Sequence, residues 1–104
     1  MSTQEKIVTV CDSLKMFLLE KNKRYGNSAL APNQTFTKLS INEQLNVRMD
    51  DKLNRIKNAN EERMNDFVDL MGYLVLKCVD KEWLNFEKLL DWGVYETQSI
   101  FYKG

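Results

Sequence analysis

The sequence predicts an all-α protein, a small helical bundle of about four helices that forms one domain over residues 1–104. Apolar residues recur at three- and four-residue steps through long stretches of the chain, which is the period of an amphipathic helix. Residues that favour helix ends separate these stretches. A length of 104 residues and a hydrophobic content of 43% suit a single globular domain.

The first helix is expected over about Thr3–Lys23. Its apolar stripe consists of Ile7, Val10, Cys11, Leu14, Phe17 and Leu18. Gly26 and Asn27 follow, and both residue types can adopt the left-handed conformation that ends a helix. No helical period continues from residue 29 to residue 39, so we expect an irregular loop after the first helix.

The second helix is expected to begin at Ser40, because Ser40 and Glu43 have the spacing of a capping box. It should fray at residues 58–60, and a third helix should run from about Glu61 to Lys81. The predicted apolar faces are Leu45, Met49, Leu53 and Ile56 on the second helix and Met64, Phe67, Val68, Met71, Leu74, Val75 and Cys78 on the third. Because a short loop joins these helices, we expect them to be antiparallel neighbours.

A short fourth helix is expected over residues 83–90. Residues 94–104 hold too many apolar side chains for a free tail, so we expect them to fold back on the domain or to pack on another subunit. The helical spacing assigns four methionines to the core: Met16, Met49, Met64 and Met71. Two tryptophans, Trp83 and Trp92, are expected to cover the open end of the bundle.

The composition excludes several classes of protein. Fifteen basic residues balance fifteen acidic ones, whereas a general nucleic-acid binder usually has a basic excess. There is no histidine, and Cys11 and Cys78 lie in separate apolar stripes, which argues against structural zinc and for buried, reduced thiols. No apolar stretch approaches the ~20 residues that span a bilayer, and the start lacks the pattern of a signal peptide. We therefore expect a cytoplasmic protein without a membrane partner.

Two polar stripes form the first candidate site. The stripe on the second helix holds Arg48, Asp51, Lys52 and Arg55, and the stripe on the third holds Asp66, Asp69, Tyr73, Lys77 and Asp80. Antiparallel neighbours would let these stripes face each other across a groove. The alternative is a pair of solvated faces with i, i+4 ion pairs that contribute only about 0.3–0.5 kcal/mol each.

Three features favour the groove. Asp66 and Asp69 repel each other on one helix face unless a cation or a basic group compensates them. Gly72, in the middle of a helix, costs about 1 kcal/mol relative to alanine, which suggests that something approaches the backbone closely there. Tyr73 adds an aromatic surface beside the carboxylates.

The segment that ends the first helix is the second candidate. Lys21, Lys23 and Arg24 concentrate positive charge, and Tyr25 offers a ring for stacking. Beyond Gly26, the side chains of Asn27 and Ser28 supply hydrogen-bond donors. These groups suit a phosphate together with a base. The alternative is an ordinary helix C-terminus, where basic residues complement the helix dipole.

Three blocks of residues resemble a group of small phage and prophage proteins. The blocks are Lys21-Asn-x-x-Tyr-Gly-Asn-Ser28, Arg48-x-Asp-Asp-Lys-Leu-x-Arg55 and Asp66-x-x-Asp-Leu-x-Gly-Tyr-Leu74. This group is similar to the nucleotide-modification-associated domain family and, more distantly, to MazG-like all-α nucleotide pyrophosphatases. The resemblance covers roughly residues 14–90. It implies a helical fold that often oligomerises and a ligand that is a nucleotide. For a phage-encoded chain it implies that the protein is located in the host cytoplasm. Asn22, which belongs to the first block, is added to the candidate ligand-binding residues.

The resemblance also bears on magnesium. In MazG-like enzymes a Glu-x-x-Glu pair on one helix and a Glu-x-x-Asp pair on the next hold magnesium against the phosphates. Asp66-x-x-Asp69 matches the second pair, with a shorter acid in first place. The first pair is not met, because Asp50 and Asp51 are adjacent and so lie about 100° apart around the helix. One magnesium ion could still take Asp51, Asp66 and Asp69 with water and substrate oxygens.

Three functions are therefore compared. The first is capture, without turnover, of a nucleotide or of a cyclic or ADP-ribose-type immune signal, which needs no cofactor. Its candidate ligand-binding residues are Lys21, Asn22, Arg24, Tyr25, Asn27, Ser28, Arg48, Asp51, Lys52, Arg55, Asp66, Asp69 and Tyr73. The second is a Mg²⁺-dependent pyrophosphatase with Asp51, Asp66 and Asp69 as metal ligands. The third is a structural or protein-interaction module whose interface is the aromatic segment 95–102. The apolar C-terminus also leads us to expect a homo-oligomer.

Overall fold

The computed structural model describes residues 1–26, 30 and 39–90. These residues form three α-helices, α1 (Thr3–Tyr25), α2 (Ile41–Asn58) and α3 (Met64–Asp80), and one 3-10 turn, η1 (Glu87–Leu90), with no strand among them. The predicted all-α class is confirmed. The expected fourth helix is reduced to the single turn η1, and the tail from residue 94 onward lies outside the described residues.

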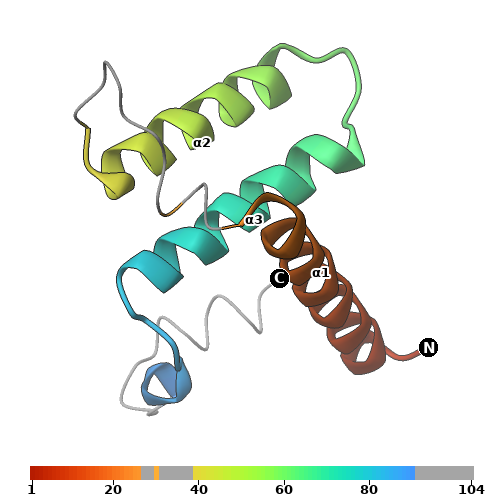
Figure 1. Cartoon of the computed structure of the whole chain (residues 1–104). Helices are drawn as coiled ribbons and strands as arrows, with labels where there is room; N and C mark the ends of the chain where they lie inside the picture. Colours follow the sequence, from red (N-terminus) through yellow and green to blue (C-terminus); the bar gives the residue numbers. More distant parts are fainter. Residues whose placement is uncertain (27–29, 31–38, 91–104) are drawn as a thin grey trace.

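Two helices form a hairpin, and the third crosses it (Figure 1). α2 and α3 lie side by side and are antiparallel, as expected. Lys52 of α2 contacts Asp69 of α3, whereas the earlier Asn46 accepts a hydrogen bond from the later Lys77. α1 meets the hairpin only near its own C-terminal end, and its N-terminal half extends away from the other two helices.

The helix ends follow mainly from local hydrogen bonds. Ser2 and Glu5 form a capping box at the start of α1: the Glu5 N–H donates to Ser2 Oγ at 3.1 Å, and the Ser2 N–H donates to Glu5 Oε1 at 3.0 Å. These bonds, chiefly the one from the Ser2 backbone, lower the pKa of the Glu5 carboxyl group. α1 continues two residues beyond the expected Lys23 to Tyr25, and Gly26 ends it with a φ of 62°.

The start of α2 confirms half of the expected capping box. The Glu43 N–H donates to Ser40 Oγ at 3.1 Å, but the Glu43 carboxylate accepts from the Ser40 hydroxyl rather than from its backbone. α3 begins at Met64 instead of Glu61, because residues 59–63 are needed to reverse the chain between the two helices. Arg63 precedes α3 without capping it through its side chain.

The buried core is small and lies between α2 and α3. Among the described residues, Leu45 and Met49 are the only buried apolar side chains, with exposed fractions of 1% and 8%. On α3 the buried positions are Asp66 and Gly72. No helix in the described part of the chain is long and apolar enough to cross a membrane.

Much of the predicted core is exposed, which corrects the expectation from sequence. The exposed side chains are Ile7, Val10, Cys11, Met16 and Phe17 on α1, Leu53 on α2, Met64, Leu74 and Val75 on α3, and Trp83 beyond it. Leu14, Leu18, Ile56, Phe67, Val68, Met71 and Cys78 are half-buried. Hydrophobic periodicity identifies the apolar side of a helix, but α1 meets α3 over only a short stretch, so most of that side finds no neighbour in the described residues.

The contact between α1 and α3 explains the glycine within α3. A Cβ atom built on Gly72 would lie 3.0 Å from Cδ2 of Leu18, which is tighter than nine in ten Cβ contacts in proteins. The close approach expected at Gly72 is therefore made by a side chain of α1. This contact sets where the C-terminal end of α1 meets the hairpin.

A double-mutant cycle should detect this contact. We expect Gly72→Leu and Leu18→Ala to be coupled favourably by about 1–3 kcal/mol in urea unfolding, because shortening Leu18 relieves the clash that the new leucine creates. Leu19→Ala is the matched control, since Leu19 is exposed and is not among the atoms nearest to Gly72. Equal coupling with both alanine variants would contradict the proposed packing.

Candidate functional site

A cleft of about 200 Å³ lies where α1 meets the hairpin. Its walls come from all three helices and consist of Leu18, Lys21, Asn22, Tyr25, Gly26, Arg48, Asp69, Gly72, Tyr73 and Leu76. Six candidate ligand-binding residues are among them: Lys21, Asn22, Tyr25, Arg48, Asp69 and Tyr73. The two sites that the sequence suggested separately, the end of the first helix and the polar stripes, therefore meet in one cleft.

Helical spacing explains which side chains reach the cleft. Leu18, Lys21 and Tyr25 lie on one face of α1 at steps of three and four residues. Leu18 rests against Gly72, and this contact brings the polar residues that follow it over α3. On α3, Asp69 lies one turn before Tyr73 on the same face.

Two cationic side chains of the cleft lie near aromatic rings. The Arg48 guanidinium carbon is 6.0 Å from the centre of the Tyr73 ring, and Lys21 Nζ is 4.8 Å from the centre of the Phe17 ring. Both distances are in the range of a cation–π interaction, which at an exposed site contributes about 0.5–1 kcal/mol. Arg48 makes no ion pair with any described residue, so its charge is available at the cleft.

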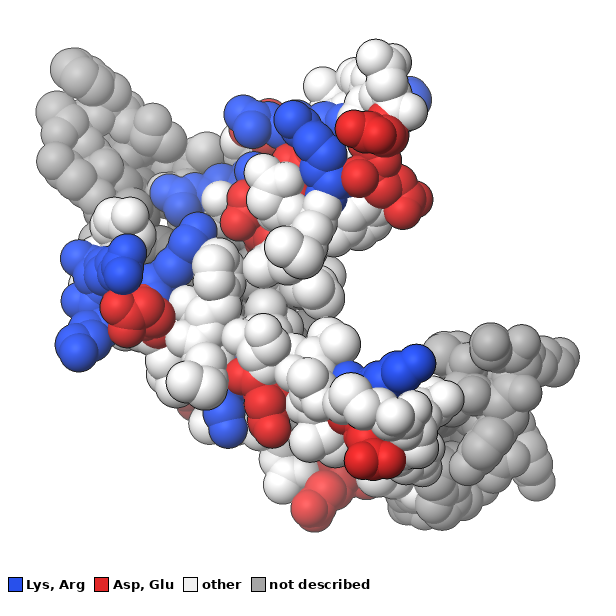
Figure 2. Space-filling model, turned by 90° about the vertical axis from the view of Figure 1, so that its right-hand side faces the viewer, with Lys and Arg blue, Asp and Glu red and all other residues white. Residues whose placement is uncertain are grey.

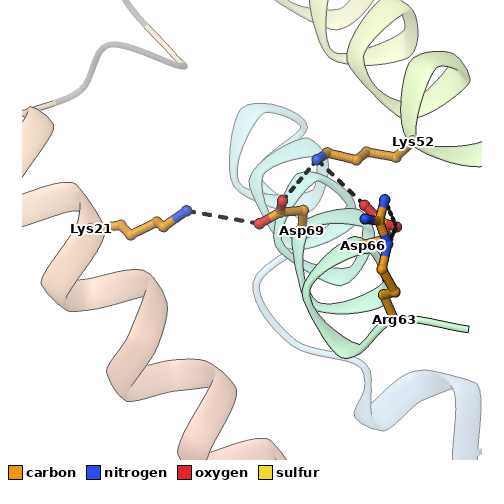
Figure 3. A network of polar contacts seen from close by, with 5 residues as sticks. All are labelled: Lys21, Lys52, Arg63, Asp66 and Asp69. Atoms are coloured by element: carbon orange, nitrogen blue, oxygen red, sulfur yellow. Dashed lines mark hydrogen bonds and ion pairs between the residues drawn. The ribbon is translucent and has the colours of Figure 1, made fainter. Parts of the chain in front are cut away.

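Five charged side chains form an alternating ion-pair chain (Figure 3). Lys21 Nζ is 3.8 Å from Asp69 Oδ1, and Asp69 Oδ2 is 2.9 Å from Lys52 Nζ. Lys52 Nζ is also 3.9 Å from Asp66 Oδ1, while Asp66 Oδ2 is 3.2 Å from Arg63 Nη2. These ion pairs link α1, α3, α2 and the residue before α3. We call the five residues together the five-residue ion-pair chain.

Its central members are removed from solvent. Asp66 is 1% exposed, and the Lys52 side chain is 14% exposed. A buried charge is tolerated only when it is paired, and here each carboxylate has two cationic neighbours. Lys52 is thus the compensating basic group that the Asp66–Asp69 pair requires, and its contacts show that the edge of the α2 stripe that carries Lys52 faces Asp66 and Asp69 of α3.

Several candidate residues do not reach the cleft. Asp51 and Arg55 are exposed on α2, and Arg55 lines a separate hollow at the turn between α2 and α3. With about 100° between successive residues, Asp51 is turned well away from the face that carries Lys52 and the buried seam. Arg24 is exposed and pairs with Glu20 of its own helix at 3.0 Å. Asn27 and Ser28 lie outside the described residues.

The carboxylates suggested as magnesium ligands do not come together. In the part of the chain that the structure describes, no group of three histidine, cysteine, aspartate or glutamate residues is close enough to hold a metal ion. Asp51 points elsewhere, and Asp66 and Asp69 both contact Lys52. This donor set does not fit a magnesium ion held by Asp51, Asp66 and Asp69.

The sequence did not identify Arg63 or Leu18 as part of the site. Arg63 lies three residues before Asp66, a spacing that brings the guanidinium onto the carboxylate. That spacing was visible in the sequence, but the first turn of α3 was expected to include Arg63 within the helix. The role of Leu18 depends on the crossing of α1 and α3, for which the sequence holds no local signal.

The comparisons with known proteins add no relative: no family model, no curated protein and no solved structure matches the chain. The features of the chain that bear on function are therefore the cleft and the five-residue ion-pair chain.

Replacing Lys52 should strongly destabilise the protein. We expect Lys52→Met to lower the free energy of unfolding by about 3–5 kcal/mol, because it leaves the buried Asp66 with only Arg63 as a partner. Lys57→Met removes an exposed lysine from the same helix and should change stability by no more than about 0.5 kcal/mol. Chemical denaturation measures both values, and similar losses for the two variants would refute the importance of the ion-pair chain.

Proposed function

We propose that the protein captures a nucleotide, or a nucleotide-derived signal of the cyclic or ADP-ribose type, without turning it over. A phage-encoded protein of this kind would withdraw an immune signal from the cytoplasm of its host. The observation that carries this proposal is the convergence of Lys21 and Arg48, from two helices, on a cleft that also holds two tyrosine rings and a carboxylate.

The cleft offers a suitable partner for each part of a nucleotide. Lys21 and Arg48 supply positive charge for a phosphate, and the guanidinium of Arg48 can bind two phosphate oxygens at once. Tyr25 and Tyr73 offer rings on which a base can stack. Asp69 can accept hydrogen bonds from ribose hydroxyls or from the amino group of a base.

The size of the cleft indicates how much of the ligand it encloses. At about 200 Å³ it is smaller than the roughly 300–1,000 Å³ of pockets that enclose a whole drug-sized molecule. We infer that it holds one phosphate-bearing end of the ligand, while the remainder extends over the surface.

Capture fits the carboxylates better than hydrolysis does. Magnesium-dependent hydrolysis would need several carboxylate oxygens free to bind the metal. Here Lys52 holds Asp69 Oδ2 and Arg63 holds Asp66 Oδ2, while Asp66 Oδ1, which accepts no hydrogen bond, is fully buried and lies 3.9 Å from Lys52 Nζ. Capture needs neither a metal nor a general base. A pyrophosphatase therefore remains the alternative with less support, and the interface suggested for segment 95–102 lies outside the described residues.

Thermal melting with a panel of linear, cyclic and ADP-ribose-derived nucleotides tests the proposal. A ligand at 100 times its dissociation constant should stabilise the protein by about 2.7 kcal/mol. We expect Arg48→Ala to weaken binding by roughly 10- to 100-fold, because a hydrogen bond to a charged group contributes about 1.5–3 kcal/mol. Arg55→Ala removes the same charge from the same helix but outside the cleft, and should have little effect.

The fate of the ligand separates capture from hydrolysis. A captured nucleotide should be recovered chemically unchanged after the protein is denatured by heat. Release of pyrophosphate with magnesium, abolished by Asp69→Asn, would establish the enzyme instead. Equal weakening by Arg48→Ala and Arg55→Ala would place the ligand outside this cleft, and the lack of a thermal shift with every nucleotide would contradict the proposal itself.

We also propose that the chain self-associates through the N-terminal half of α1. Ile7 and Val10 lie three residues apart on one face of α1, and each is more than half exposed. Figure 2 views the molecule from the side on which Figure 1 places the N-terminus, and uncharged side chains cover a broad part of that face. Exposed apolar patches of this kind usually mark contact surfaces, and a second copy of α1 offers a matching apolar stripe.

Sedimentation velocity over a range of protein concentrations tests this self-association. The unchanged protein should sediment as a dimer or a larger assembly, and Val10→Lys should shift it toward monomer, because a charge would be buried in the interface. Thr9→Lys adds the same charge one residue away, on another side of α1, and should leave the assembly intact. A monomer at all concentrations would overturn the idea.

A further inference from the structure

Lys52 has a position that the proposed capture of a nucleotide does not by itself explain. Its Nζ atom contacts both carboxylates of the Asp66–Asp69 pair, at 3.9 and 2.9 Å, and its side chain is largely buried between α2 and α3. Lys21 and Arg63 contact the same two carboxylates only from the outside, and each is at least half exposed. Figure 3 shows the Lys52 ammonium group between the two acids.

Two carboxylates one turn apart on a helix face form a place of concentrated negative charge. Such a pair attracts a divalent cation or a basic side chain, since either relieves the repulsion between the acids. An ammonium group brings three hydrogen-bond donors and one positive charge to this place, and it cannot diffuse away. A metal ion could enter between the acids only if Lys52 left, because two cations there would repel each other.

We propose that Lys52 takes the place of a divalent cation between Asp66 and Asp69, and that it thereby orients Asp69 for ligand recognition without a metal. Lys52 holds the Oδ2 atom of Asp69, so Oδ1 is directed to the side of Lys21 and the cleft. The side chain of Asp69 is 24% exposed, whereas Asp66 is fully buried. Of the two acids, only Asp69 lines the cleft.

This arrangement specifies the ligand further, and this step rests on the proposed capture of a nucleotide. An acceptor oxygen beside the Lys21 ammonium suits a ligand in which a hydrogen-bond donor lies next to an anionic group. A sugar hydroxyl beside a phosphate has this chemistry. Lys52 acts here as a positioning residue, since it contacts Asp69 and does not line the cleft.

Manganese binding by the protein without nucleotide tests the first part. We expect electron paramagnetic resonance to detect no saturable Mn²⁺ site in the unchanged protein or in Lys52→Arg, which keeps a cation between the acids. Lys52→Met frees the two carboxylates, so it should gain one Mn²⁺ site and its melting temperature should rise with Mn²⁺. The double variant Lys52→Met with Asp69→Asn should lose that site again.

Two results would overturn the proposal. One is a saturable Mn²⁺ site in the unchanged protein that Asp69→Asn removes, because the metal would then displace Lys52. The other is a folded Lys52→Met protein that takes up no Mn²⁺. If Lys52→Met does not fold, the unchanged protein and Lys52→Arg decide the question by the same measurement, since a metal site in either contradicts the proposal and its absence from both supports it.

Nucleotide binding in EDTA and in magnesium tests the second part. We expect a nucleotide that raises the melting temperature to do so equally in both conditions, and Lys52→Arg to retain most of the shift. A shift that requires magnesium would refute the role of Lys52 and leave nucleotide capture standing. A protein that binds neither nucleotide nor Mn²⁺ would refute capture and leave the metal-replacing role of Lys52 intact.

Discussion

The contact between Lys52 and the acidic pair of α3 is the constraint on which the rest of the structure depends. Only two apolar side chains, Leu45 and Met49, are buried in the described residues, so the hairpin of α2 and α3 has little hydrophobic area to fix its register. An ammonium group placed between Asp66 and Asp69 fixes that register by charge and by distance. Sliding α2 by one turn would leave a buried carboxylate without its partner, which is far more costly than exchanging one apolar contact for another.

The same contact joins the fold to the cleft. Asp69 is held from one side by Lys52 and faces Lys21 of α1 on the other, so a contact within the hairpin orients a carboxylate that lines the cleft. Arg48, one turn before Lys52 on α2, lies near the ring of Tyr73. The residues that stabilise the hairpin and those that line the cleft are therefore neighbours on the same helix faces, and a change in one set alters the other.

The sequence predicted local features well, because local rules determine them. Ser40 at the start of α2, Gly26 at the end of α1 and the antiparallel hairpin all follow from capping, glycine conformation and loop length. The close approach at Gly72 was also predictable, since a glycine in mid-helix is costly without a reason. The residue spacing in the sequence could not identify which side chain approaches Gly72, because that side chain belongs to Leu18, more than fifty residues away in the chain.

The errors have a common physical origin. A stripe of apolar residues shows that a helix has a side suited to burial, but not how much of that side another helix covers, so Ile7, Val10 and Met64 were wrongly assigned to the core. Similarly, the stripe of polar residues on α2 is wide, and only its edge toward the seam reaches α3. Lys52 lies at that edge, whereas Asp51 and Arg55 lie beyond it. Periodicity shows in which direction each side chain points from the axis of its own helix. The site depends in addition on the angle at which two helices cross, which periodicity does not give.

The single crossing point of α1 has a mechanical consequence. Leu18 divides this helix into a long arm of about 22 Å toward Thr3 and a short arm of about 10 Å toward Tyr25, at 1.5 Å per residue. If α1 tilts about Leu18, its free end travels roughly twice as far as Tyr25 does, and in the opposite direction. A molecule that bound the long arm and tilted α1 about Leu18 would therefore also change the width of the opening that Tyr25 borders.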